Sequence, residues 1–293
     1  MAVNKRIYRP YSGRYTSEKT RFLVLPRYAF RTLFDSRFLL AFFVACNIPT
    51  LLFMATIYLS HNQVAQAMLQ VKGTVILDID NSFFERYLRF QGLLSFLLAA
   101  WVGPGLISSD LSNDALPLYL ARPFSRTEYV LGKFTVLAAL LSAVTWIPGL
   151  LLFAVQSDLA DWAWFAKFYW IAGAILLGAC LWITMISLMA LAFSAWIKWK
   201  LSATAMMLGA FFALAGFGEA INEVLRTKWG KLFNLPSAIQ SVWLDLFRVP
   251  MYSRFRGGVG DLPSWAAWLM LTTFTAFCLL MLNSKLKARE VVR

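Results

Sequence analysis

The sequence predicts an all-α integral membrane protein with six transmembrane helices. Of its 293 residues, 59% are hydrophobic and only 15% are charged, whereas about a quarter of the residues of a soluble domain are charged. The mean hydropathy is +0.61. A water-soluble core cannot bury so much apolar surface in a chain of this length, so the bilayer must solvate much of it.

Six apolar runs are long enough to cross the hydrocarbon core, which takes roughly 20 residues of α-helix. The predicted spans are 38–60, 88–109, 129–155, 168–197, 201–220 and 265–284. Pro49 and Pro148 predict kinks within spans, because proline removes a helical hydrogen bond. We therefore expect a single six-helix transmembrane domain, 38–293, preceded by an N-terminal segment, 1–37.

The placement of basic residues predicts the orientation. The net charge of +13 is compatible with nucleic acid or with lipid headgroups, but the Lys and Arg residues flank apolar runs, which favours the membrane and argues against nucleic acid. Nine basic and two acidic residues precede residue 38, and four basic and one acidic residue follow residue 284. Because basic segments stay in the cytoplasm, we expect both termini there and the chain in the inner (cytoplasmic) membrane.

The N-terminal segment is predicted to contain a short amphipathic helix that begins near Pro26 and lies in the membrane surface. Its two faces are a polar one with Arg27, Arg31 and Asp35 and an apolar one with Phe30, Leu33 and Phe34.

The segment 221–264 is predicted to lie outside the cell, although it carries six basic residues. It also contains apolar runs too short to span, such as 236–247. These predict short re-entrant or interfacial helices before the last span, and an extracytoplasmic partner could dock on them.

Catalytic groups are scarce. The one histidine, His61, follows the first predicted span, and the three cysteines each lie within an apolar run. The sequence has no GxxxxGK[ST] motif to hold ATP phosphates. We expect no enzyme activity, metal or cofactor in this chain. Lys133 and Glu219 are the two charges predicted within spans, both near span ends, so the energy should come from a partner.

The loop 110–128, between the second and third predicted spans, is the most specific part of the chain. Ser125 and Glu128 match a capping box, in which the serine hydroxyl accepts the Glu128 N–H and the glutamate reaches back. The third span should begin there, with Arg122 and Arg126 beside it in the cytoplasm.

This loop resembles the signature of type-2 permeases of ATP-binding-cassette (ABC) exporters. In that family an acidic residue ends the second span and an Arg-Pro-containing string opens the third. Asp110 occupies the acidic position, and the string is matched by Ala121-Arg122-Pro123-Phe124-Ser125-Arg126, Glu128-Tyr129 and Gly132-Lys133. The chain departs from the family pattern at 113–115, where Asn-Asp-Ala replaces a turn of the (N/E)GT kind.

The resemblance implies a permease that pairs with a second permease, expected to be a copy of itself, and with two copies of a cytoplasmic ATPase that binds ATP and Mg. It also implies that the first cytoplasmic loop and the N-terminal helix dock on the ATPase and that the permeases export substrate by alternating access. The implied coupling surface comprises Arg27, Arg31, Asp110, Asp114, Arg122, Pro123, Ser125, Arg126 and Glu128.

Two alternatives remain open on the sequence. A mechanical transducer would relay ATP-driven motion to an extracytoplasmic partner at 221–264 without moving a substrate. A membrane scaffold would need no energy coupling and no capped loop. The substrate cannot be read from these uncharged, aromatic-rich spans.

Overall fold

The computed structural model describes residues 23–68, 78–113, 115, 125–249 and 262–287. Within these residues the protein is helical and contains no strands, as expected. Six helical runs are long and apolar enough to cross a membrane, at Arg37–His61, Asn81–Ser112, Arg126–Leu159, Trp170–Trp196, Lys200–Leu225 and Ser264–Lys285. The predicted all-α, six-span fold is thereby confirmed.

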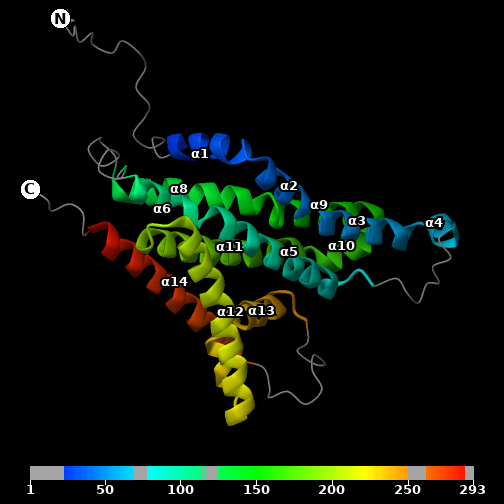
Figure 1. Cartoon of the computed structure of the whole chain (residues 1–293). Helices are drawn as coiled ribbons and strands as arrows, with labels where there is room; N and C mark the ends of the chain where they lie inside the picture. The colour runs from blue at the N-terminus through cyan, green and yellow to red at the C-terminus, as the bar shows by residue number, and fades with distance from the viewer. Residues whose placement is uncertain (1–22, 69–77, 114, 116–124, 250–261, 288–293) are drawn as a thin grey trace, which may run out of the picture.

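Three of the described spans consist of two helices placed end to end (Figure 1). The first joins α2 (Arg37–Ala45) to α3 (Ile48–His61), the second α5 (Asn81–Val102) to α6 (Pro104–Ser112), and the third α8 (Arg126–Ser142) to α9 (Trp146–Leu159). The breaks precede Pro49 and Pro148, as predicted, and a third break at Pro104 was not predicted. Each proline lies in the first turn of the second helix or just before it, where its missing N–H costs least.

The second span begins seven residues before its predicted start, at Asn81 instead of residue 88. The prediction that Lys133 and Glu219 are the two charges within spans is wrong, because Arg89 already lies within the predicted span 88–109 and the earlier start adds Glu85 and Arg86. The start is fixed by Asp80, whose carboxylate accepts the Phe83 N–H at 3.1 Å. The apolar stretch 90–109 still has the roughly 20 residues that cross a bilayer, so the charges lie beyond its end.

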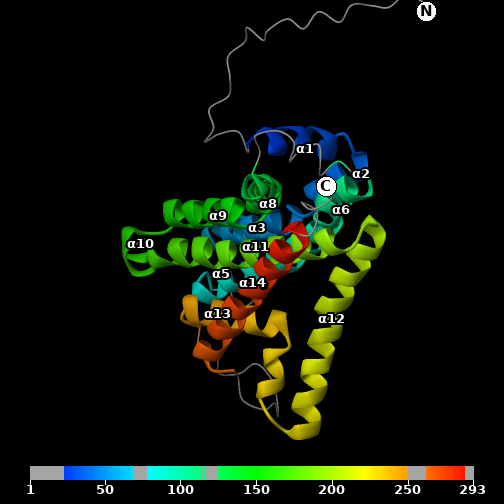
Figure 2. The ribbon, with the colours of Figure 1, turned by 90° about the vertical axis from the view of Figure 1, so that its left-hand side faces the viewer.

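The fourth span, α11 (Trp170–Trp196), is the centre of the bundle. It contacts α5, α6, α8, α9, α12 (Lys200–Leu225) and α14 (Ser264–Lys287). In its most apolar stretch 72% of the residues are buried, against 22% for α12 and 17% for the first span. Figures 1 and 2 show α12 inclined away from the bundle, and one face of α12 makes its contacts.

Short helices occur where they were expected before the last span: η3 (Trp229–Leu232) and α13 (Leu235–Leu246). The indole of Trp243 in α13 enters the bundle, and its Nε1–H donates to the Gly178 carbonyl of α11 at 3.0 Å. Gly92 of α5 leaves room for this ring, since a Cβ there would lie 2.7 Å from it. A re-entrant or interfacial position for these helices remains a prediction.

Two further short helices follow spans, α4 (Gln63–Met68) and α10 (Trp162–Phe168). They lie at the end of the bundle opposite α1 (Val24–Phe34), as Figure 1 shows. We call the end that carries α1, α6 and the start of α8 the α1 end. The predicted N-terminal helix is present as α1, with Pro26 in its first turn. Its position in a membrane surface remains a prediction.

Candidate functional site

The predicted capping box at the start of α8 is present. The Glu128 N–H donates to Ser125 Oγ at 3.2 Å, and the Ser125 N–H donates to Glu128 Oε2 at 2.6 Å. Ser125 takes an extended backbone conformation, so the chain turns sharply into the helix there. Two of the N–H groups at the start of α8 are therefore satisfied within a single turn, which fixes where the third span begins.

A charged pair joins the end of the second span to the start of the third. Asp110 of α6 accepts the Tyr129 hydroxyl at 2.6 Å and lies 2.8 Å from the Lys133 ammonium, both through Oδ2. Tyr129 and Lys133 are four residues apart, so they share one face of α8. Tyr129 is fully buried and Lys133 is 8% exposed. We call these three residues the α6–α8 clamp.

The other side of α6 is held by α11. The Ser194 hydroxyl donates to the Pro104 carbonyl at 2.6 Å and accepts the N–H groups of Ile107 and Ser108 at 3.0 and 2.9 Å. One side chain of a neighbouring span therefore contacts a carbonyl and two N–H groups in the first turns of α6. α6 is consequently fixed to α8 and to α11 at once.

The N-terminal helix α1 packs against α8 (Figure 1). Phe30 and Leu33 pack against the core, whereas Arg27 and Arg31 are exposed. The predicted division into an apolar and a polar face is thus present, and part of the apolar face rests on protein. The two arginines and the capped start of α8 lie at the same end of the molecule.

The sequence-predicted site residues fall into two groups. Those that the structure describes are Arg27 and Arg31 on α1, Asp110 on α6, and Ser125, Arg126 and Glu128 at the start of α8. Asp114, Arg122 and Pro123 lie outside the described residues. Tyr129 and Lys133 were not predicted to be partners of Asp110. The sequence does show that Tyr129 and Lys133 are four residues apart, directly after the capping box, and therefore lie on one face of the helix that begins there.

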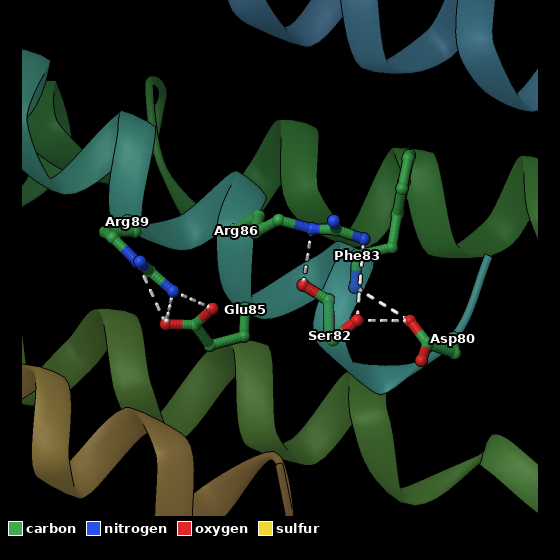
Figure 3. A network of polar contacts seen from close by, with 6 residues as sticks. All are labelled: Asp80, Ser82, Phe83, Glu85, Arg86 and Arg89. Carbon is green, nitrogen blue, oxygen red and sulfur yellow. Dashed lines mark hydrogen bonds and ion pairs between the residues drawn. The ribbon is translucent and has the colours of Figure 1, made fainter. Parts of the chain in front are cut away.

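A second charged network lies at the start of α5, at the opposite end of that span (Figure 3). The Glu85 carboxylate is fully buried and accepts the Arg89 Nε–H at 3.1 Å, while the Arg89 side chain is 38% exposed. Arg86 donates to the Ser82 carbonyl at 3.2 Å. The neighbouring Asn81 amide donates to the Phe247 carbonyl at 2.8 Å, which ties α5 to the end of α13.

Residues 30–282 match the family model of the ABC-2 family transporter protein. The chain belongs to this family. The ABC-2 chain is therefore a multi-pass membrane subunit of an ABC transporter and is not itself the ATPase, and the family implies an ABC ATPase as its partner. No curated protein matches the chain.

The match covers the α6–α8 clamp, the capping box and five of the six spans entirely. In this ABC-2 subunit the loop 113–124 is flanked by α6, which two neighbours hold, and by α8, which the capping box starts. A load applied to that loop would reach both spans through short, satisfied contacts.

Proposed function

We propose that this chain is the permease of an ABC exporter and couples ATP hydrolysis by a separate ATPase subunit to substrate export by alternating access. The observation that carries the proposal is the α6–α8 clamp beside the capped start of α8. Buried charges are costly to leave unpaired, so Asp110 and Lys133 should hold the two spans in one geometry. A push on the loop between them would then move both spans together.

The coupling surface comprises Arg27 and Arg31 on α1 with Asp110, Asp114, Arg122, Pro123, Ser125, Arg126 and Glu128. This assignment is supported by the packing of α1 on α8, because an ATPase that docked there would contact both helices at once. ATP and Mg would bind to two copies of that ATPase, and this chain would supply no cofactor ligands. Both termini would face the cytoplasm from an inner membrane, since the α1 end would face the ATPase.

A second permease, a copy of this chain, would complete the transporter. The first span and α12 bury 17% and 22% of their most apolar stretches, so most of their apolar surface is left for lipid or for another subunit. Alternating access between two permeases needs such a shared face. The copy number is tested by cross-linking in the membrane.

A mechanical transducer is the second candidate, and one observation favours it. α12 runs 26 residues, longer than a bilayer requires, and ends with Val224 and Leu225 exposed at 80% and 64%. An extracytoplasmic partner could bind this apolar tip. A scaffold without energy coupling remains the third possibility, though it would have no use for the clamp.

The proposal is tested by purifying the tagged chain from its native membrane in mild detergent and identifying the proteins that accompany it. We expect an ABC ATPase in stoichiometric amount, with ATP hydrolysis in the purified complex. Reconstitution into vesicles then separates the two candidates, since a permease moves a substrate and a transducer does not. Absence of an ATPase even after cross-linking would contradict the proposal.

A further inference from the structure

The first span is broken beside Pro49, and a neighbouring helix completes its hydrogen bonds. Between α2 and α3 the Cys46 carbonyl accepts the Gln91 side-chain amide of α5 at 3.1 Å. The same amide nitrogen lies 3.1 Å from Thr50 Oγ1, in the first turn of α3. A side chain of the second span therefore contacts both sides of this break.

The third span is broken in the same manner, ahead of Pro148. Thr145, between α8 and α9, has a backbone conformation outside the helical region, with φ −103° and ψ −85°. Its carbonyl accepts two hydrogen bonds, from the Gly149 N–H at 3.1 Å and from the Tyr87 hydroxyl of α5 at 3.1 Å.

One hydroxyl joins the two breaks. Tyr87 Oη lies 3.1 Å from the Thr145 carbonyl and 3.3 Å from Thr50 Oγ1, and its ring is fully buried. The breaks of the first and third spans therefore lie at one level in the bundle, where α3 also contacts α9. Gln91 Oε1 is buried here with no partner in the described part of the chain, so the network has spare bonding capacity.

We propose that the α2–α3 and α8–α9 breaks form one shared hinge, with Tyr87 and Gln91 of α5 as its pins. The hinge rests on the proposed function, because the force that would bend it comes from the ATPase and enters through α1 and the start of α8. The halves α2 and α8 tilt together relative to α3 and α9. The hydrogen bonds from Gln91 to the Cys46 carbonyl and from Tyr87 to the Thr145 carbonyl hold both breaks to α5 and limit the angle.

The hinge is tested by spin-label distances measured within single spans of the complete complex with its ATPase. One label pair crosses each break: Phe38 with Tyr58 in the first span, and Leu131 with Leu151 in the third. The matched control pair is Leu177 with Trp196 in the unbroken α11. All six positions are at least 48% exposed. The labelled chain carries Cys46→Ala, Cys180→Ala and Cys278→Ala and is diluted with unlabelled chain to suppress distances between copies.

On trapping with ATP and vanadate, both crossing pairs should shift by on the order of 2–5 Å, the scale of helix displacements in switching proteins. The α11 pair should stay constant. A complex that hydrolyses ATP while both crossing pairs stay fixed, or while one alone shifts, would overturn the shared hinge and leave the proposed function standing. Failure to isolate an ATPase would instead refute the proposed function.

Variants of the pins separate the hinge from general packing. Tyr87→Phe removes one hydroxyl and should broaden the distance distributions of both spans without nucleotide. Gln91→Leu should broaden the first span more than the third, because its amide contacts Cys46 and Thr50 of the first span directly and reaches the third span through Tyr87. Thr56→Val, a polar-to-apolar change at a half-buried position on α3 whose hydroxyl bonds within its own helix, is the control and should leave both distributions unchanged. Unchanged distributions in both pin variants would refute their role.

Discussion

At the scale of single residues, the account depends on Asp110 and its two partners on α8. The carboxylate is 16% exposed and the Lys133 side chain 10% exposed, so water screens this pair little. Leaving one such charge without its partner is more damaging than removing both. Changes to this pair should therefore have a measurable effect on stability, whereas changes to a solvent-exposed ion pair would have little effect.

Lys133→Met should lower the free energy of unfolding by roughly 3–5 kcal/mol, because Asp110 would then be largely buried without its cation. The double variant Asp110→Asn with Lys133→Met should recover a large part of that loss. Thermal unfolding of the purified chain in detergent measures the single variants Lys133→Met and Asp110→Asn and the double variant in a double-mutant cycle. Strictly additive losses would show that the two side chains act independently and would contradict the clamp.

The capping box gives a second residue-scale prediction. Ser125→Ala removes the acceptor for the Glu128 N–H and should cost about 1 kcal/mol of stability. We also expect it to reduce ATP hydrolysis in the complex, since the start of α8 would fray where the load enters. Thr135→Val, a change at a half-buried position later in α8 whose hydroxyl bonds within the helix, is the control and should leave hydrolysis unaltered. Equal activity in the two variants would remove the cap from the coupling path.

At the scale of elements, the position of α13 depends on two glycines, Gly92 and Gly178, that leave room for the Trp243 ring. Gly92→Ala should destabilise the chain by about 1–3 kcal/mol, because its Cβ would lie 2.7 Å from a ring held between helices. Gly173→Ala is the matched control, since nothing lies within 4 Å of a Cβ there. It should be neutral or stabilising by up to ~1 kcal/mol. Equal effects, read from thermal unfolding, would mean that α13 does not insert as described.

The elements also show what the sequence could predict. Hydropathy located all six spans, and proline located two of the three breaks, because both signals are local. The early start of α5 was missed because Glu85, Arg86 and Arg89 lower the hydropathy there, although Asp80 as an N-cap residue and the helical spacing of Phe83, Phe84 and Tyr87 indicate a helix. The break at Pro104 was missed because Gly103 and Pro104 read equally well as the end of a span.

The clamp and the pins could not be predicted in the same way. Tyr129 and Lys133 are visible as a helical pair, but their pairing with Asp110 depends on how α6 packs on α8. Tyr87 meets Thr145 across 58 positions of sequence. Contacts of this range follow from tertiary packing, which local periodicity does not encode.

At the scale of the whole molecule, α1, the α6–α8 clamp and the two helix breaks form one mechanical path. Load from an ATPase would enter at the α1 end, pass through α1, the loop and the clamp, and reach the breaks pinned by α5. The helices beyond the breaks, α3 and α9, would respond. Arg126→Glu should therefore lower ATP hydrolysis in the complex while insertion into the membrane stays normal, which membrane fractionation measures. Normal hydrolysis in this charge-reversed variant would place the docking surface elsewhere.

The most direct test of the central claim is cysteine cross-linking in native membranes from Arg126→Cys, at the start of α8, compared with Trp162→Cys at the opposite end of the bundle. Trp162 is 78% exposed, so its position is accessible to a partner. The account predicts that the chain with Arg126→Cys cross-links to an ABC ATPase and that the chain with Trp162→Cys does not. Cross-linking to the ATPase from position 162, or from neither position, would contradict it.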